Sequence, residues 1–131
     1  MKKLFVACAI LVSLASFIPL SQETPIQKIT ARFLKVIESK NEAEGKKFVE
    51  ENYSDFFLNH VPMNIHLKVM NDLQKDYYKN TVVSKTFTAT KVVLVVRSAI
   101  NNKQKQVSME TDPANPQKIF IVDVKEVNAG N

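Results

Sequence analysis

Cysteine, tryptophan and glycine are almost missing from this chain of 131 residues, which has one cysteine, no tryptophan and two glycines. The only cysteine, Cys8, has no partner for a disulfide within the chain, so packing has to supply the stability. Glycines at positions 45 and 130 alone exclude the Gly-x-Ser-x-Gly turn that presents a nucleophilic serine in many hydrolases. No catalytic residue is therefore predicted.

Histidine is also scarce, and its spacing does not suit a metal site. His60 and His66 are six residues apart, whereas a metal-binding pair on one helix is four apart, so that the side chains lie one above the other. No metal site and no cofactor are predicted. The 18 basic and 13 acidic residues are interleaved, and a nucleic-acid partner is not expected without a clustered basic face and stacking aromatic residues.

The chain does have a long apolar run at its N-terminal end. Lys2 and Lys3 precede an almost wholly apolar stretch, residues 4–18, and Pro19 follows it. This order is typical of a secretory signal peptide. We expect residues 1–22 to be a cleaved signal and the protein to be exported, periplasmic or extracellular, with no membrane span after cleavage.

Two alternatives to a cleaved signal use the same segment. An uncleaved anchor needs roughly 20 apolar residues, and this run is shorter. A lipoprotein signal would use Cys8, but only residues 4–7 would then form the apolar region, which usually has ~7–15 residues. The cleavage site stays open between Ser16, Ser21 and Gln22, and each choice removes Cys8 from the mature protein.

The spacing of the apolar residues changes near Tyr78, from helical before it to alternating or continuous after it. The pattern predicts a first helix capped by Thr24 and Gln27, a shorter second helix capped by Asn41, a short helical turn at residues 54–58, and a third helix from Val61-Pro62 to about Tyr77. Four strands are predicted next, over residues 81–88, 91–98, 105–111 and 118–127.

Short connections between these strands make neighbours antiparallel. Residues 92–96 are apolar on both faces, so this strand should be interior. The prediction is one α+β domain, residues 23–127, with three N-terminal helices packed on one face of a four-stranded antiparallel meander. Residues 128–131 are expected to form a short tail.

Several stretches resemble a known family. Residues 32–41 and 48–54 with Val61-Pro62 are similar to small domains of nuclear transport factor 2-like type in secreted bacterial proteins, some of which precede a β-lactamase-related serine hydrolase. The strand end at residues 96–98 and the turn at residues 116–119 match in order. The resemblance implies a curved sheet wrapped around helices as a cone, which in many relatives holds a small ligand or pairs with another chain.

Three residues are the candidate ligand-binding set: His66, Tyr77 and Arg97. His66 falls in the middle of the apolar arc of the third helix, where a polar group needs a partner that a cavity or ligand could supply. The alternative is a core histidine bonded to a backbone carbonyl. Arg97 ends the valine-rich strand, where it would either meet an anionic ligand or extend its charge to solvent. We expect the site between the third helix and the sheet.

These observations favour a non-catalytic binding or interaction module. A small-molecule ligand, an envelope protein or a second copy in a homodimer is the expected partner. The alternatives are a purely structural accessory and a small enzyme similar to ketosteroid isomerase, although Asp72, Asp76 and Glu110 are expected to be solvated. A cystatin-type inhibitor is disfavoured because residues 104–108 lack the glycine of that family's Gln-x-Val-x-Gly loop.

Overall fold

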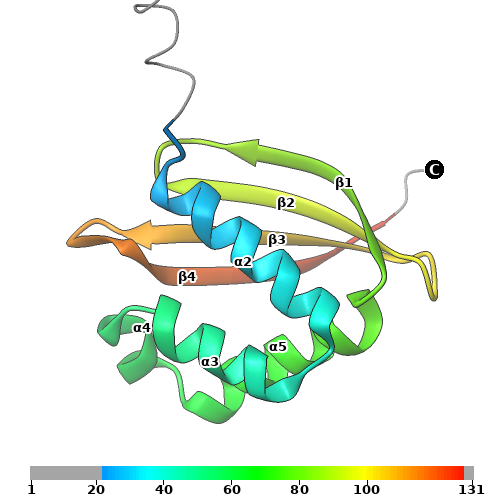
Figure 1. The fold of residues 1–131 in the computed structure, drawn as a ribbon, viewed down its shortest axis with the longest axis horizontal. Helices are drawn as coiled ribbons and strands as arrows, with labels where there is room; N and C mark the ends of the chain where they lie inside the picture. Colours follow the sequence, from blue (N-terminus) through cyan, green and yellow to red (C-terminus); the bar gives the residue numbers. More distant parts are fainter. Residues whose placement is uncertain (1–21, 129–131) are drawn as a thin grey trace, which may run out of the picture.

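The computed structural model describes residues 22–128, which fold as four helices followed by a four-stranded sheet (Figure 1). Apart from Gln22, the predicted signal peptide lies outside the described residues, and so does most of the predicted tail. The elements are α2 Pro25–Ser39, α3 Glu42–Asn52, α4 Asp55–His60, α5 Met63–Tyr77, β1 Asn80–Phe87, β2 Lys91–Ser98, β3 Gln104–Asp112 and β4 Asn115–Val127. Among residues 22–128, no helix is long and apolar enough to cross a membrane.

The α+β architecture is confirmed, and the helix count of three is wrong. Residues 55–60, which lie at and beyond the expected short turn, form the separate helix α4. The Ser54 side chain accepts a hydrogen bond from the Phe57 backbone N–H at 3.2 Å, which caps this helix. The helix ends at His60, two residues before Pro62. Six residues are too few to show a helical period, so the sequence indicated only a turn.

The expected caps of the first two long helices are present. Thr24 and Gln27 form a capping box at the start of α2, with Pro25 as its first residue. At the other end of α2, Lys40 adopts the left-handed conformation, with φ of 52°. Asn41 follows directly and accepts hydrogen bonds from the backbone of Ala43 and Glu44. One helix therefore ends and the next begins within two residues.

The sheet has the strand order β1-β2-β3-β4, and each neighbouring pair is antiparallel. The interior position of β2 is confirmed. Because side chains alternate along a strand, the register divides the sheet into two faces. We call the helix-covered side the inner face; on it lie Val92, Leu94, Val96, Val107 and Met109, all fully buried. We call the opposite side the outer face; its side chains on the last three strands are Lys91, Val93, Val95, Arg97, Gln104, Gln106, Ser108, Glu110, Ile121, Asp123, Lys125 and Val127.

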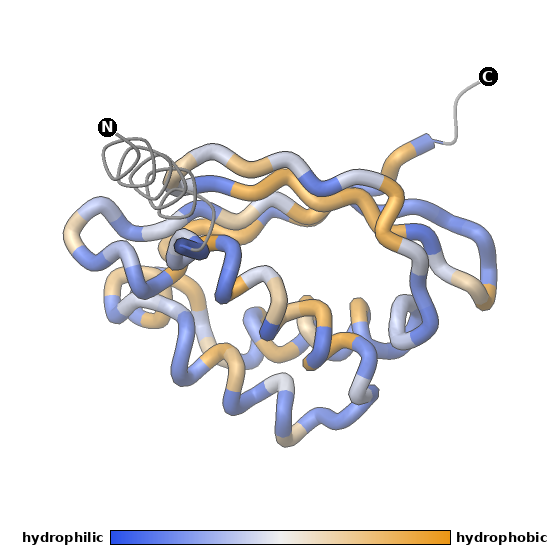
Figure 2. The backbone as a smooth tube through the Cα atoms, turned by 45° about the horizontal axis from the view of Figure 1, so that its top comes forward, coloured by the Kyte–Doolittle hydropathy of each residue, from blue (hydrophilic) through white to orange (hydrophobic). Residues whose placement is uncertain are grey.

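The core lies between the helices and the inner face. In Figure 1, α2 crosses the strands diagonally and α3, α4 and α5 lie beside it on the same side of the sheet. The apolar stripe of α2 is buried there through Ile26, Ile29, Phe33 and Ile37. Figure 2 shows long hydrophobic stretches in part of the sheet, whereas the helices alternate between hydrophobic and hydrophilic residues. One layer of helices therefore covers one face of the sheet.

A close approach between α3 and α5 explains the glycine within α3. A Cβ atom at Gly45 would lie 2.9 Å from Cγ of Met70, which is too close for an ordinary contact. Glycine costs roughly 1 kcal/mol of helix propensity, and the tight packing of the two helices accounts for its presence here.

The third predicted helix, now α5, is oriented differently from the prediction. A helical wheel of this segment predicts Ile65 within the apolar arc and Gln74 as a polar residue toward one end of it. In the structure Ile65 is 46 % exposed and Gln74 is buried. The Gln74 side-chain amide donates hydrogen bonds to the backbone carbonyls of Val36 at 3.0 Å and Asn41 at 2.8 Å. These carbonyls belong to the last turn of α2 and to the N-cap of α3, so a polar side chain is what this buried position requires.

Candidate functional site

His66 lies in a filled aromatic corner of the helical layer. The residue is 4 % exposed, and its ring makes edge contacts with Tyr53, at a centroid distance of 5.0 Å, and Phe57, at 4.5 Å. The His66 Nε2 atom is 3.2 Å from the backbone carbonyl oxygen of Phe57. This contact matches the alternative of a core histidine bonded to a carbonyl. Three hollows among residues 22–128 are described below, and His66 lines none of them.

Arg97 lies on the outer face of the sheet, opposite the helices. Its strand neighbours Val96 and Ser98 are buried on the inner face, and its register partners are Thr81 and Gln104. The structure therefore does not bring His66, Tyr77 and Arg97 together in one site between α5 and the sheet. The sequence held a signal for this, because Lys91 and Arg97 share the odd-numbered positions of β2.

Tyr77 lines a hollow of about 230 Å³ between α5 and strands β3 and β4, which we call the α5 hollow. Its lining residues are Val69, Asp72, Leu73, Asp76, Tyr77, Lys105 and Val124. The tyrosine is only 2 % exposed, and its hydroxyl makes no hydrogen bond with residues 22–128. This hollow occupies the expected place between the third long helix and the sheet, and it contains one of the three expected residues.

The charges around the α5 hollow are mostly paired. Lys68 donates to Asp72 Oδ2 at 2.8 Å, and Lys105 Nζ is 3.5 Å from Glu126 Oε1. Burial raises the pKa of Tyr77, and the carboxylates of Asp76 and Glu126 raise it further. The phenol is therefore neutral at ordinary pH and can both donate and accept a hydrogen bond.

Sequence analysis missed Lys105 and Val124 as neighbours of Tyr77. Lys105 shares its strand face with Val107 and Met109, which are buried on the inner face. That alternation places the lysine on the helix side of the sheet, so it was the available signal. The contact with α5 itself could not be read, because it depends on where the helix crosses the strands.

The outer face carries the largest of the three hollows, an open trough of about 570 Å³. Side chains along its lining include Val93, Gln106, Ser108, Ile121 and Asp123. The described helices all lie on the other side of the sheet (Figure 1). Val93 and Val95 therefore lie on this face with no element of residues 22–128 over them, beside polar side chains of β3 and charged side chains of β4.

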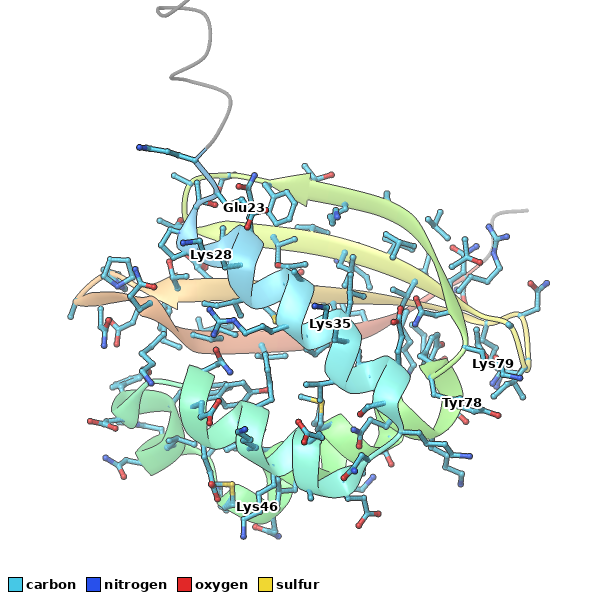
Figure 3. The ribbon with its side chains drawn as sticks, viewed as in Figure 1. Glu23, Lys28, Lys35, Lys46, Tyr78 and Lys79 are labelled. Carbon is cyan, nitrogen blue, oxygen red and sulfur yellow. The ribbon has the colours of Figure 1, made fainter. Side chains whose placement is uncertain are left out.

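A third hollow, of about 230 Å³, lies between α2 and α3 and is lined by charged side chains together with Val36 and Phe48. Arg32 Nη1 donates to Asn52 Oδ1 at 2.6 Å across it. Lys28 and Lys35 on α2 and Lys46 on α3 project from the exposed side of the helical layer, as Figure 3 shows. We read this surface as solvated, because basic and acidic side chains alternate over it.

Among residues 22–128, these surfaces carry no cluster of side chains arranged for metal binding. Within residues 22–128, no group of three or more histidine, cysteine, aspartate or glutamate side chains is placed to hold a metal ion. Asp72 is exposed, whereas Asp76 and Glu110 are half-buried. The outer face and the α5 hollow are therefore the two candidate binding surfaces.

Comparison with protein-family models, curated proteins and solved structures gives no match to this chain. The similarity to nuclear transport factor 2-like domains accordingly stays a prediction.

Proposed function

We propose that this protein is an exported, non-catalytic interaction module that forms a homodimer through the outer face of its sheet. The observation that carries the proposal is the arrangement of side chains on that face. It is uncovered within the described chain, and it carries Val93 and Val95 on the interior strand β2 among polar and charged neighbours. Its pattern of side chains becomes complementary to itself when the strand direction is reversed.

The reversal follows from symmetry. A two-fold axis in the interface plane and perpendicular to the strands places each strand over its own copy, running the opposite way. On β2, Val93 then lies over Val95 of the second copy, and apolar side chains cover each other. Stacked sheets pack with strand directions within about 30°, so this arrangement is an ordinary sheet-on-sheet contact.

Strand β4 gives the charge complementarity. Its outer residues run Ile121, Asp123, Lys125 and Val127. Reversal puts Asp123 over Lys125 of the second copy, and the two-fold axis repeats this pair. It also puts Ile121 over Val127 of the second copy. Within one copy Lys125 Nζ is already 3.3 Å from Asp123 Oδ2, so the dimer would join two such pairs into one network.

One pair in this arrangement is unfavourable. Lys91 lies over Arg97 of the second copy, and both are basic. Glu110 is the register partner of Lys91 on the neighbouring strand, so its carboxylate lies beside the two cations. Both cations are at the end rows of the face, where long side chains reach solvent.

The size of the face sets the expected affinity. Four strands at about 4.8 Å spacing and eight residues at about 3.3 Å rise give roughly 500 Å² per copy. Specific interfaces commonly bury about 800 Å² per partner. We therefore expect a reversible dimer that dissociates on dilution.

The test is sedimentation equilibrium or light scattering over a dilution series. Val95→Glu places a charge over the apolar Val93 of the second copy and should weaken dimerisation at least tenfold. Ile65→Glu is the matched control, because Ile65 is an exposed apolar residue of α5, on the helix side of the sheet and away from the outer face. A monomeric parent protein, or equal effects of the two changes, would contradict the proposal.

A charge exchange tests the pairing itself. Asp123→Lys alone should weaken the dimer, because it sets lysine over Lys125 of the second copy. Adding Lys125→Asp to the same chain restores opposite charges in both the intrachain and the interchain pair, so dimerisation should return. A double variant as weak as the single one would rule out this register.

The outer face of the sheet bears on dimer formation and on neither of the two other predicted roles. The structural accessory to an envelope protein and the small enzyme similar to ketosteroid isomerase both stay predictions.

A further inference from the structure

We propose that the α5 hollow binds a small organic cation, an alkylammonium group with a short apolar body. The hollow lies on the helix side of the sheet, so this site is separate from the outer face and does not depend on the homodimer. Three features carry the inference: an apolar floor, an acid without a basic partner, and a nearly buried phenol without a hydrogen bond.

The apolar floor comes from both layers. Val69 and Leu73 belong to α5, and Val124 belongs to β4. A volume of about 230 Å³ is smaller than the usual 300–1,000 Å³ of sites for drug-sized ligands. The ligand that fits is therefore small, with an apolar part that can lie against these three side chains.

Asp76 decides the sign of the ligand's charge. It is half-buried at the hollow and has no salt bridge with any residue of the described chain. The other charged groups nearby already have partners, since Asp72 binds Lys68 and Lys105 lies beside Glu126. The unpaired charge of the hollow is therefore negative, which favours a cation over an anion.

Tyr77 provides a polar group for the ammonium. The residue is 2 % exposed and lines the hollow, and its hydroxyl keeps some solvent contact and has no hydrogen-bond partner within residues 22–128. A hydroxyl that reaches the hollow without a protein partner is free to bind a polar group of a ligand there. An ammonium N–H can donate to the phenol oxygen while a second N–H donates to the Asp76 carboxylate.

The backbone around these two residues is fixed, so the groups are held in place. Ser98 Oγ donates to the Asp76 backbone carbonyl at 2.6 Å, and Asn80 Nδ2 donates to that of Tyr77 at 2.7 Å. The end of α5 is thereby tied to the sheet, and ligand binding does not have to order it.

The experiment uses three probes of equal chain length: n-hexylammonium, 1-hexanol and hexanoate. Binding to the parent protein is followed at low salt by NMR, through the methyl signals of Leu73 and Val124. We expect hexylammonium to bind at least tenfold more tightly than hexanoate, with hexanol between them. Equal affinities for the three probes, or shifts confined to methyl groups elsewhere, would overturn the proposal.

Variants then assign the contacts. Asp76→Asn should weaken hexylammonium binding about tenfold and leave hexanol binding unchanged, and Tyr77→Phe should weaken hexylammonium binding two- to fivefold. Asp112→Asn is the matched control, because this aspartate is at the β3–β4 turn, at the far end of β3 from Lys105. Equal losses in Asp76→Asn and Asp112→Asn would contradict the assignment. Retention of binding in Val95→Glu would separate this site from the dimer.

Discussion

The two faces of strand β2 have almost the same composition and very different surroundings. On the inner face, Val92, Leu94 and Val96 are fully buried under the helices. On the outer face, Val93 and Val95 alternate with them along the same strand and are only half-buried. Nothing in the side chains distinguishes the two sets, so the difference comes entirely from what lies over each face.

This comparison changes how an apolar strand is interpreted. A strand that is apolar on both faces usually has a layer on each side. Here a single helical layer covers one face, so the second apolar set has no cover from residues 22–128. The apolar pattern therefore indicates that both faces of β2 are covered. The helices cover the inner face, and in our proposal a second copy covers the outer face.

The largest difference between the faces should appear on truncation of a buried side chain. Leu94→Ala should lower the free energy of unfolding by ~2–5 kcal/mol, because it removes apolar contact and leaves a cavity. Val95→Ala, next to it on the outer face, should cost about 1 kcal/mol or less in the monomer. Urea denaturation at low protein concentration measures both. Equal losses would mean that the two faces are equally covered.

A smaller effect on stability is expected on the helix-covered side of the sheet, where a change of pH ionises a tyrosine only after unfolding. Burial raises the pKa of Tyr53, which is 4 % exposed, well above its usual value. In the unfolded chain a tyrosine releases its proton near pH 10. Above that pH the folded state binds more protons than the unfolded state, so stability should fall by up to about 1.4 kcal/mol per pH unit.

Tyr53→Phe removes this contribution, so stability should fall less between pH 9 and pH 11 than in the parent protein, by about 1 kcal/mol. The measurement is chemical denaturation at both pH values. Tyr78→Phe is the control, because Tyr78 is half-buried at the end of α5 (Figure 3). If Tyr53→Phe leaves the pH dependence unchanged, the hydroxyl of Tyr53 is not held in a dry environment.

The smallest effect is expected on the outer face. Arg97→Ala should change monomer stability by no more than about 0.5 kcal/mol, because the side chain is partly exposed and makes no salt bridge with the described residues. Thermal or urea unfolding of dilute protein checks this. A loss above about 2 kcal/mol would place Arg97 in a packed environment and remove the contrast between the faces.

Local chemistry made much of the fold predictable. The capping box of Thr24 and Gln27, the cap at Asn41 and the turn before Gln104 depend on neighbours within a few residues, and all three are in place. The short turns also fixed the antiparallel order of the strands. Pro116 was expected in the last turn and instead lies in β4, which is an edge strand and tolerates proline there.

Orientation was harder to predict than element type. The helical wheel put Ile65 inside and Gln74 at the margin, and the structure exposes the first and buries the second. Burial of Gln74 depends on two carbonyls, one in the last turn of α2 and one at the N-cap of α3, each more than 30 residues away. A wheel drawn for one helix holds no information about such partners.

The candidate site failed to assemble for a related reason. Alternation along β2 shows that Arg97 faces with Val93 and Val95, and the charges of Lys91 and Arg97 at the two ends were the available signal for the uncovered face. His66 and Tyr77 lie at opposite ends of α5, eleven positions apart, so one small ligand could not contact both. Only Tyr77, near the end of the helix, lies over a hollow.

Strand β1 has a consequence for how the protein behaves when crowded. As an edge strand with Val82 and Val83 exposed, it could template the growth of fibrils. Its pairing shifts between Val82 and Ser84, and such a bulge twists the strand and interrupts the regular row of free backbone groups. Lys85 adds a charge just beyond the bulge. The edge is therefore protected against amyloid-like stacking.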